Sequence, residues 1–206
     1  PLPHSLLFPL CSFFCRHILS APLARPRTLL VGTAFATGAA VMFFGALLAL
    51  YFSVRKDTLA WGAEWFPEGA IELKPGGSLM STYAMATITM MWAHYASRNE
   101  DRIHGYLALG LTALLGVAAV TQTVFYFNDI GLPIDHSVAT TLLYVIVGAH
   151  MVMTGIAVLW MGLVLLRAFG GQATGRHQDL VISVSIFWYS AVAVFTVIWL
   201  FIYVAK

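Results

Sequence analysis

Two histidines inside long apolar stretches are the residues of this sequence that could support redox chemistry. His94 and His150 are expected at similar depth from the same face of the protein, because an α-helix rises about 1.5 Å per residue. Two facing imidazoles could ligate the iron of a b-type haem. The alternative, which we favour, is that each imidazole hydrogen-bonds to a neighbouring helix or a lipid headgroup. No second histidine pair or local motif accompanies them.

The most polar cluster inside an apolar stretch consists of Thr121, Gln122 and Thr123. Interhelical hydrogen bonding is the simpler expectation for these side chains, and a substrate site is the alternative. Asp, Glu, Lys and Arg are absent from the deep part of every apolar stretch, which argues against a transporter or pump. The sequence also has no P-loop, dinucleotide-binding glycine motif, zinc-binding helix motif or nucleophile elbow. We therefore predict no catalytic, cofactor-binding or metal-binding residue in this chain.

Two arginines and two cysteines remain as candidates for interactions at the membrane surface. Arg55 and Arg167 follow apolar stretches, where a cation can meet both a helix C-terminus and a lipid phosphate, so each is a candidate headgroup site. Cys11 and Cys15 are too few for a disulfide framework and are expected to be buried or lipid-facing thiols, with palmitoylation or metal binding as alternatives.

The elements that carry these residues are five apolar stretches. The chain has 206 residues, of which 60% are hydrophobic and 10% charged, whereas soluble domains have about 25% charged residues. A membrane span needs about 20 apolar residues, and its backbone groups must be paired internally, so each stretch should be a helix. We predict an all-α integral membrane bundle over residues 28–206, with spans at about 28–54, 79–97, 103–128, 136–166 and 180–205.

Charges between the predicted spans indicate the orientation. One side carries seven basic and three acidic residues, and the other carries four basic and six acidic residues. The positive-inside rule then places the N-terminus in the cytoplasm and the C-terminus outside. Residues 1–27 should form a cytoplasmic or interfacial arm, and the outer connection 55–78, with Trp61, Trp65 and Phe66, an aromatic interfacial segment. The net charge of +2 does not indicate nucleic acid binding.

Small residues at regular spacing predict where helices approach one another. They recur every four residues in the first span and every seven in the fourth: Gly32, Ala36 and Ala40, then Gly148, Gly155 and Gly162. His150 lies about 200° around the helix from Gly148, so it should point away from that seam, towards another helix or lipid.

With the spans placed, the region from Leu29 to Lys206 resembles subunit III of the haem-copper oxidases, in its five-helix bacterial form. The matching segments are Val41–Gly45, Tyr51–Arg55, the Trp61–Pro67 loop, Gln122 with Tyr126, Gly148–His150 with Arg167, and Phe187–Trp188 with Phe195–Ile198 and Tyr203. That form begins inside and ends outside, in agreement with the loop charges.

The resemblance also shows departures at polar positions of the family. A membrane-buried Glu is replaced by Ala40, the Glu of the third span by Phe125, and the second His of the fourth span by Met153. The final-span His and Asp positions carry Tyr189 and Val192. The resemblance therefore implies a divergent member, with His150 and Arg167 as the surviving matched polar residues.

What the resemblance implies is an accessory, non-redox subunit of a terminal oxidase in a bacterial cell membrane. Haem and copper are expected in partner subunits. This chain would pack on subunit I, beside subunit II and small subunits, bind phospholipid, and support proton uptake and stability during oxygen reduction. Cytochrome c is the expected electron donor of the complex, with quinol as the alternative, and a nitric-oxide-reductase-associated relative of the same family is a further variant. A larger respiratory supercomplex is possible. The rival functions are a b-haem membrane anchor that uses His94 and His150, and a small membrane transporter.

Overall fold

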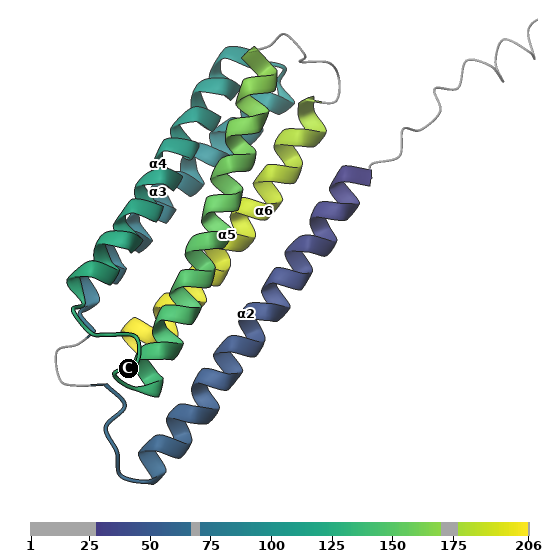
Figure 1. Cartoon of the computed structure of the whole chain (residues 1–206). Helices are drawn as coiled ribbons and strands as arrows, with labels where there is room; N and C mark the ends of the chain where they lie inside the picture. The colour runs from purple at the N-terminus through teal and green to yellow at the C-terminus, as the bar shows by residue number, and fades with distance from the viewer. Residues whose placement is uncertain (1–27, 67–70, 170–176, 206) are drawn as a thin grey trace, which may run out of the picture.

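A computed structural model describes residues 28–66, 71–169 and 177–205 of the chain, and throughout these ranges the regular structure is helical (Figure 1). The helices are α2 (Thr28–Ala60), α3 (Leu73–Arg98), α4 (Arg102–Asp129), α5 (Val138–Phe169) and α6 (His177–Ile198), followed by the π-helix η1 (Trp199–Val204). The predicted all-α class is confirmed for this part of the chain. The predicted arm, with Cys11 and Cys15, lies outside the described residues.

Within the part of the chain that the structure describes, four helical segments are long and apolar enough to cross a membrane: α2, α4, α5 and the continuous stretch Asp179–Val204. α3 has 26 residues but does not meet the same criterion. Its serines, threonines and His94 make it more polar than the other helices, and several of its hydroxyl groups bond to neighbouring helices.

α6 lies at the centre of the bundle. It packs against α2, α3 and α5, while α4 closes the other side by packing on both α3 and α5 (Figure 1). Consecutive helices run in opposite directions through the α3–α6 body, and α2 stands at its edge. This arrangement brings α3, α5 and α6 together around the middle of the bundle, where the polar core described below lies.

α2 and α3 extend beyond the apolar stretches that predict them. α2 continues through Arg55, Lys56 and Asp57 to Ala60, so the expectation that Arg55 lies at a helix end is wrong. α2 then ends in a Schellman motif, in which Gly62 has a φ of 72° and Ala63 N–H donates to Thr58 O at 3.2 Å. α3 begins at Leu73, six residues before the predicted span. Its Pro75 lies in the first turn, where no intrahelical N–H is needed.

A short turn joins α3 to α4, and Asp101 makes hydrogen bonds to the end of α3 and to the start of α4. Glu100 has a φ of 59°, and Asp101 N–H donates to Ala96 O at 3.0 Å, which closes α3. The Asp101 side chain then accepts from the backbone N–H of His104 at 3.2 Å and lies 2.7 Å from His104 Nδ1, which caps α4. The backbone N–H of His104 holds the pKa of the Asp101 carboxyl below its ordinary value of 3.8.

The glycines at close helix contacts are not the predicted ones. A Cβ on Gly116 would lie 2.5 Å from Val158 Cγ2 and 3.3 Å from the Trp188 ring, and one on Gly76 would lie 2.6 Å from the Tyr203 ring. By contrast, a Cβ on Gly155 or Gly162 would meet no atom within 4 Å. A Cβ on Gly148 would lie 4.0 Å from Phe127.

The predicted small-residue seams therefore do not form the tight contacts. The buried face of α5 instead runs through His150, Thr154, Ala157 and Met161. On α2, Gly32 and Ala36 are exposed and line a pocket of about 480 Å³ that α5 and α6 complete, while Ala40 packs partly buried against the core. The small residues leave open space here because α2 packs closely mainly in its second half, where Phe44, Leu48 and Tyr51 are buried, whereas Thr33 is the one buried residue of its first turns.

Candidate functional site

His150 lies at the centre of the bundle and holds α5 to α6. Its side chain is 2% exposed, and Nε2 lies 2.8 Å from the backbone oxygen of Ala191. A carbonyl oxygen can only accept, so Nε2 must carry the proton in this bond. The prediction that His150 points away from Gly148 towards another helix is confirmed.

Aromatic rings from three other helices surround this imidazole. The ring centroids of Phe44, Tyr83 and Phe195 lie 6.0, 5.6 and 5.2 Å from that of His150. These rings belong to α2, α3 and α6, so four helices meet at one histidine. The arrangement offers packing and one directed hydrogen bond.

A second hydrogen bond beside His150 joins α3 to α5. The hydroxyls of Tyr83 and Thr154 lie 2.8 Å apart, and Thr154 also donates to the backbone oxygen of His150 at 3.1 Å. Because the Thr154 proton is used in that bond, Tyr83 donates to Thr154. We name Tyr83, His150 and Thr154, with the Ala191 carbonyl, the polar core. Its hydrogen bonds join α3 to α5 and α5 to α6, and one further bond, from Thr154 to the His150 carbonyl, lies within α5.

His94 is too far along α3 to share a ligand with His150. Tyr83 contacts His150, and His94 follows Tyr83 by eleven residues on the same continuous helix. At 1.5 Å per residue that separates the two along the axis by about 16 Å. The expectation of similar depth is therefore wrong, because α3 begins earlier than the apolar stretch indicates. One haem iron cannot bind both imidazoles in this fold.

At the end of the bundle where α2 terminates, two contacts secure α2. Trp65 Nε1 donates to the Tyr51 hydroxyl at 2.9 Å, and both side chains are buried. Arg55 places its two terminal nitrogens 3.4 and 3.5 Å from the backbone oxygen of Ala205, just after η1. Trp65 is thus a core residue and not an interfacial one, whereas Trp61 is 89% exposed. Because Arg55 donates to the Ala205 carbonyl, fewer of its N–H groups are available to a lipid phosphate.

The remaining candidates differ in exposure. Arg167 is exposed in the last turn of α5, as expected for a headgroup site. Trp188 is fully buried, and its ring fits against Gly116. Tyr126 is buried, with its ring centroid 5.8 Å from that of Tyr203. Of these three side chains, Arg167 is the exposed one.

Gln122 makes the interhelical hydrogen bond that its position predicts. Its Oε1 accepts from Thr82 of α3 at 3.1 Å. Thr121 and Thr123 donate instead to carbonyls of their own helix, Val117 O and Ala119 O, at 3.0 and 2.9 Å. The three residues therefore form no shared polar site.

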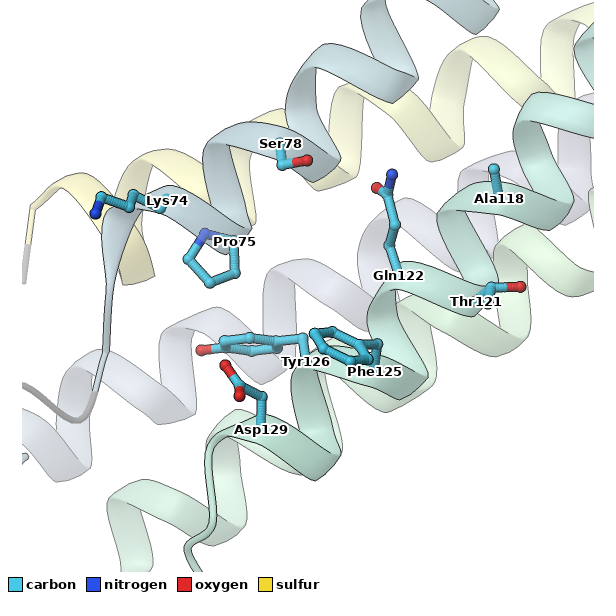
Figure 2. A pocket seen from close by; sticks show the side chains of 9 residues that line it. All are labelled: Lys74, Pro75, Ser78, Ala118, Thr121, Gln122, Phe125, Tyr126 and Asp129. Atoms are coloured by element: carbon cyan, nitrogen blue, oxygen red, sulfur yellow. The ribbon is translucent and has the colours of Figure 1, made fainter.

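A groove of about 670 Å³ runs between the first turns of α3 and the second half of α4 (Figure 2). Lys74, Pro75 and Ser78 of α3 form one wall. The other wall is one face of α4: Ala118, Thr121, Gln122, Phe125, Tyr126 and Asp129. Figure 2 shows the Tyr126 ring and the Asp129 carboxylate together on the α4 wall, with Lys74 on the opposite wall. The groove is apolar along most of its length and charged at one end.

The sequence alone identifies only some of the residues described above. Gln122, Tyr126 and His150 stand out as polar groups in apolar stretches. Tyr83 and Thr154 do not, because isolated hydroxyls are common in membrane helices and their partners lie on other helices. The burial of Trp65 cannot be predicted, because it lies in a connection rich in aromatic residues, which is typical of an interfacial segment.

Comparison with known proteins assigns the family. The family model described as cytochrome c oxidase subunit III matches residues 26–206. The chain is 28% identical over 174 residues to cytochrome c oxidase subunit 3 of Corynebacterium diphtheriae, covering 82% of this chain and 84% of that protein.

Vertebrate relatives of the same name also match. Cytochrome c oxidase subunit 3 of Struthio camelus is 26% identical and that of Salmo salar 27%, each over 174 residues and 83% of this chain. The chain spans 65% of the length of these two relatives. The match covers all five described helices, including His150 and both walls of the groove. The chain is a membrane protein that belongs to the cytochrome c oxidase subunit III family.

Proposed function

We propose that the chain is the accessory, non-redox subunit III of a cytochrome c oxidase in a bacterial cell membrane. It packs on the haem- and copper-carrying subunit I, beside subunit II and small subunits, binds phospholipid, and supports proton uptake and stability during oxygen reduction. Family membership supports its place in the complex. The observation that carries the non-redox role is the polar core, where His150 and its neighbours are occupied in holding helices together.

The same proposal includes five membrane spans with the N-terminus inside. α3 is counted as the fifth span because it is 26 residues long and packs against both α4 and α6. The antiparallel helices place Arg98, Arg102 and Arg167 at one end of the bundle and Lys56 and Lys74 at the other. The arginine-rich end faces the cytoplasm under the positive-inside rule.

Affinity purification of the tagged full chain from its native membrane tests this function. We expect a large haem-copper subunit at equal stoichiometry, identified by mass. Recovery of the chain alone, or with partners that carry no haem-copper centre, would contradict the proposal. In parallel, the isolated chain should show no haem absorbance and, reconstituted in vesicles, no solute transport.

A further inference from the structure

The groove between α3 and α4 has the length of one membrane leaflet. Its α4 wall extends from Ala118 to Asp129, eleven residues apart on a continuous helix. That corresponds to about 16 Å along the helix axis. The hydrocarbon core of a bilayer is about 30 Å thick, so one leaflet contributes about 15 Å. With Asp129 near the membrane surface, the Ala118 end lies close to the bilayer midplane.

Polarity changes along the groove in the order that a phospholipid requires. The surface end carries Lys74 and Asp129, the rings of Tyr126 and Phe125 follow on the α4 wall, and the deep end is formed by Gln122, Thr121 and Ala118. Gln122 accepts from Thr82 and Thr121 donates to Val117 O, so the polar groups of the deep end are already paired within the protein. A charged headgroup and an apolar chain would therefore each meet matching side chains. An aqueous solute would instead face an apolar wall over much of the groove.

The two charges at the surface end are of opposite sign and are not joined to each other. Lys74 and Asp129 are both exposed, and among the described residues the ion pair within 4 Å is that of His104 with Asp101. Figure 2 places Lys74 and Asp129 on opposite walls. A headgroup that carries both a phosphate and a primary ammonium can satisfy both at once. The carboxylate accepts hydrogen bonds from an ammonium but not from a quaternary amine, which has no N–H.

The groove holds about 670 Å³, which lies within the range of roughly 300–1,000 Å³ for small-molecule sites.

We propose that this groove binds one phospholipid with a phosphoethanolamine-type headgroup. Its phosphate pairs with Lys74, its ammonium hydrogen-bonds to Asp129, and one acyl chain lies along Phe125 and Ala118. The inference requires that the chain is embedded in a membrane, but it does not depend on the chain's membership in an oxidase. It is also separate from the headgroup positions predicted at Arg55 and Arg167.

Native mass spectrometry of the full chain tests the headgroup preference. The chain is released from bilayers that contain phosphatidylethanolamine, phosphatidylcholine and phosphatidylglycerol in equal amounts, and the retained lipid is counted. We expect about tenfold preference for phosphatidylethanolamine over phosphatidylcholine, the effect of one charge-assisted hydrogen bond. Asp129→Asn should abolish this preference, and Asp129→Lys should shift it to phosphatidylglycerol. Asp135→Asn, at the same end but outside the groove, is the matched control and should change nothing.

A second pair of variants tests the acyl-chain part. Ala118→Trp fills the deep end and should reduce lipid retention several-fold, whereas Leu114→Trp, on an exposed position outside the groove lining, should not. Equal retention of the three lipids by the wild-type chain, or an unchanged preference in Asp129→Asn, would overturn the proposal.

Photocrosslinking in the intact complex separates a lipid from a protein occupant. A benzophenone side chain at position 125 should label phospholipid, and labelling of a polypeptide would overturn the proposal. If the chain purifies without a haem-copper partner yet retains this lipid, the proposed place in an oxidase fails and the lipid site stands.

Discussion

The first and last helical segments of the described chain are similar in composition but differ in their surroundings. In α6 the side chains of Trp188, Ala191 and Phe195 are fully buried. In α2, Phe35 is 76% and Met42 79% exposed, and close packing is confined mainly to its second half. Both segments are long and apolar enough to cross a membrane.

This difference shows that burial in a membrane bundle depends on fit and not on hydrophobicity. Lipid chains are as apolar as leucine, so an apolar side chain gains little merely by moving from lipid to a helix contact. Burial in α6 is accompanied by close van der Waals contacts, as between Trp188 and Gly116, and by the hydrogen bond from His150 to Ala191 O. The first half of α2 has few such contacts, and it keeps an open pocket beside Gly32 and Ala36.

The largest expected effect comes from truncating the centre of α6. Trp188→Ala should lower the free energy of unfolding by about 3 kcal/mol, because it leaves a cavity between α6 and α4. The matched variant Phe35→Ala on α2 should change it by no more than about 0.5 kcal/mol. Unfolding in mixed micelles with increasing SDS measures both, and equal losses would contradict the contrast between the two helices.

A smaller effect is expected at the glycine contact beside Trp188. Gly116→Ala should cost about 1–3 kcal/mol, because the new methyl group meets Val158 and Val158 is restricted at χ1. Gly155→Ala has open space and should be neutral or stabilising. The same unfolding assay compares them. A greater loss of unfolding free energy for Gly155→Ala than for Gly116→Ala would support the predicted helix contact along Gly148, Gly155 and Gly162.

The polar core should contribute less than the packing around it. Tyr83→Phe removes the hydroxyl that bonds to Thr154 and should cost about 0.6 kcal/mol, with an upper bound of about 1.7 kcal/mol. A double-mutant cycle with Thr154→Val isolates the pair. Tyr95→Phe, at an exposed position of α3, serves as the control. No coupling energy between positions 83 and 154 would mean that the hydroxyls do not join α3 to α5.

The smallest effect concerns acid pH at the α3–α4 turn. The pKa of Asp101 is lowered in the folded protein, so the stabilisation from its ionised form is complete above the ordinary value of 3.8 and is lost as the pH falls through the lowered value. Asp101→Asn keeps a capping side chain but removes this titration. It should flatten the dependence of stability on pH between about pH 5 and pH 2. An unchanged dependence would show that the carboxylate does not stabilise the turn.

Much of the helical layout can be predicted from the sequence, because the length of an apolar stretch and the charges that flank it do not depend on contacts with distant helices. The Schellman motif at Gly62 and the cap at Asp101 also depend on nearby residues. The tight contacts at Gly76 and Gly116 could not be predicted, since their large partners, Tyr203 and Val158 with Trp188, come from distant helices. The same holds for the groove, where Lys74 and Asp129 are brought together by the pairing of α3 with α4.

The central claim is that this chain supports an oxidase without holding any of its redox centres. The most direct measurement compares the oxidase purified from cells with and without the chain, for haem absorbance per catalytic subunit and for oxygen uptake over many turnovers. We predict equal haem content and a faster decline of activity when the chain is missing. Loss of a haem together with the chain, or an identical decline in both preparations, would contradict the account.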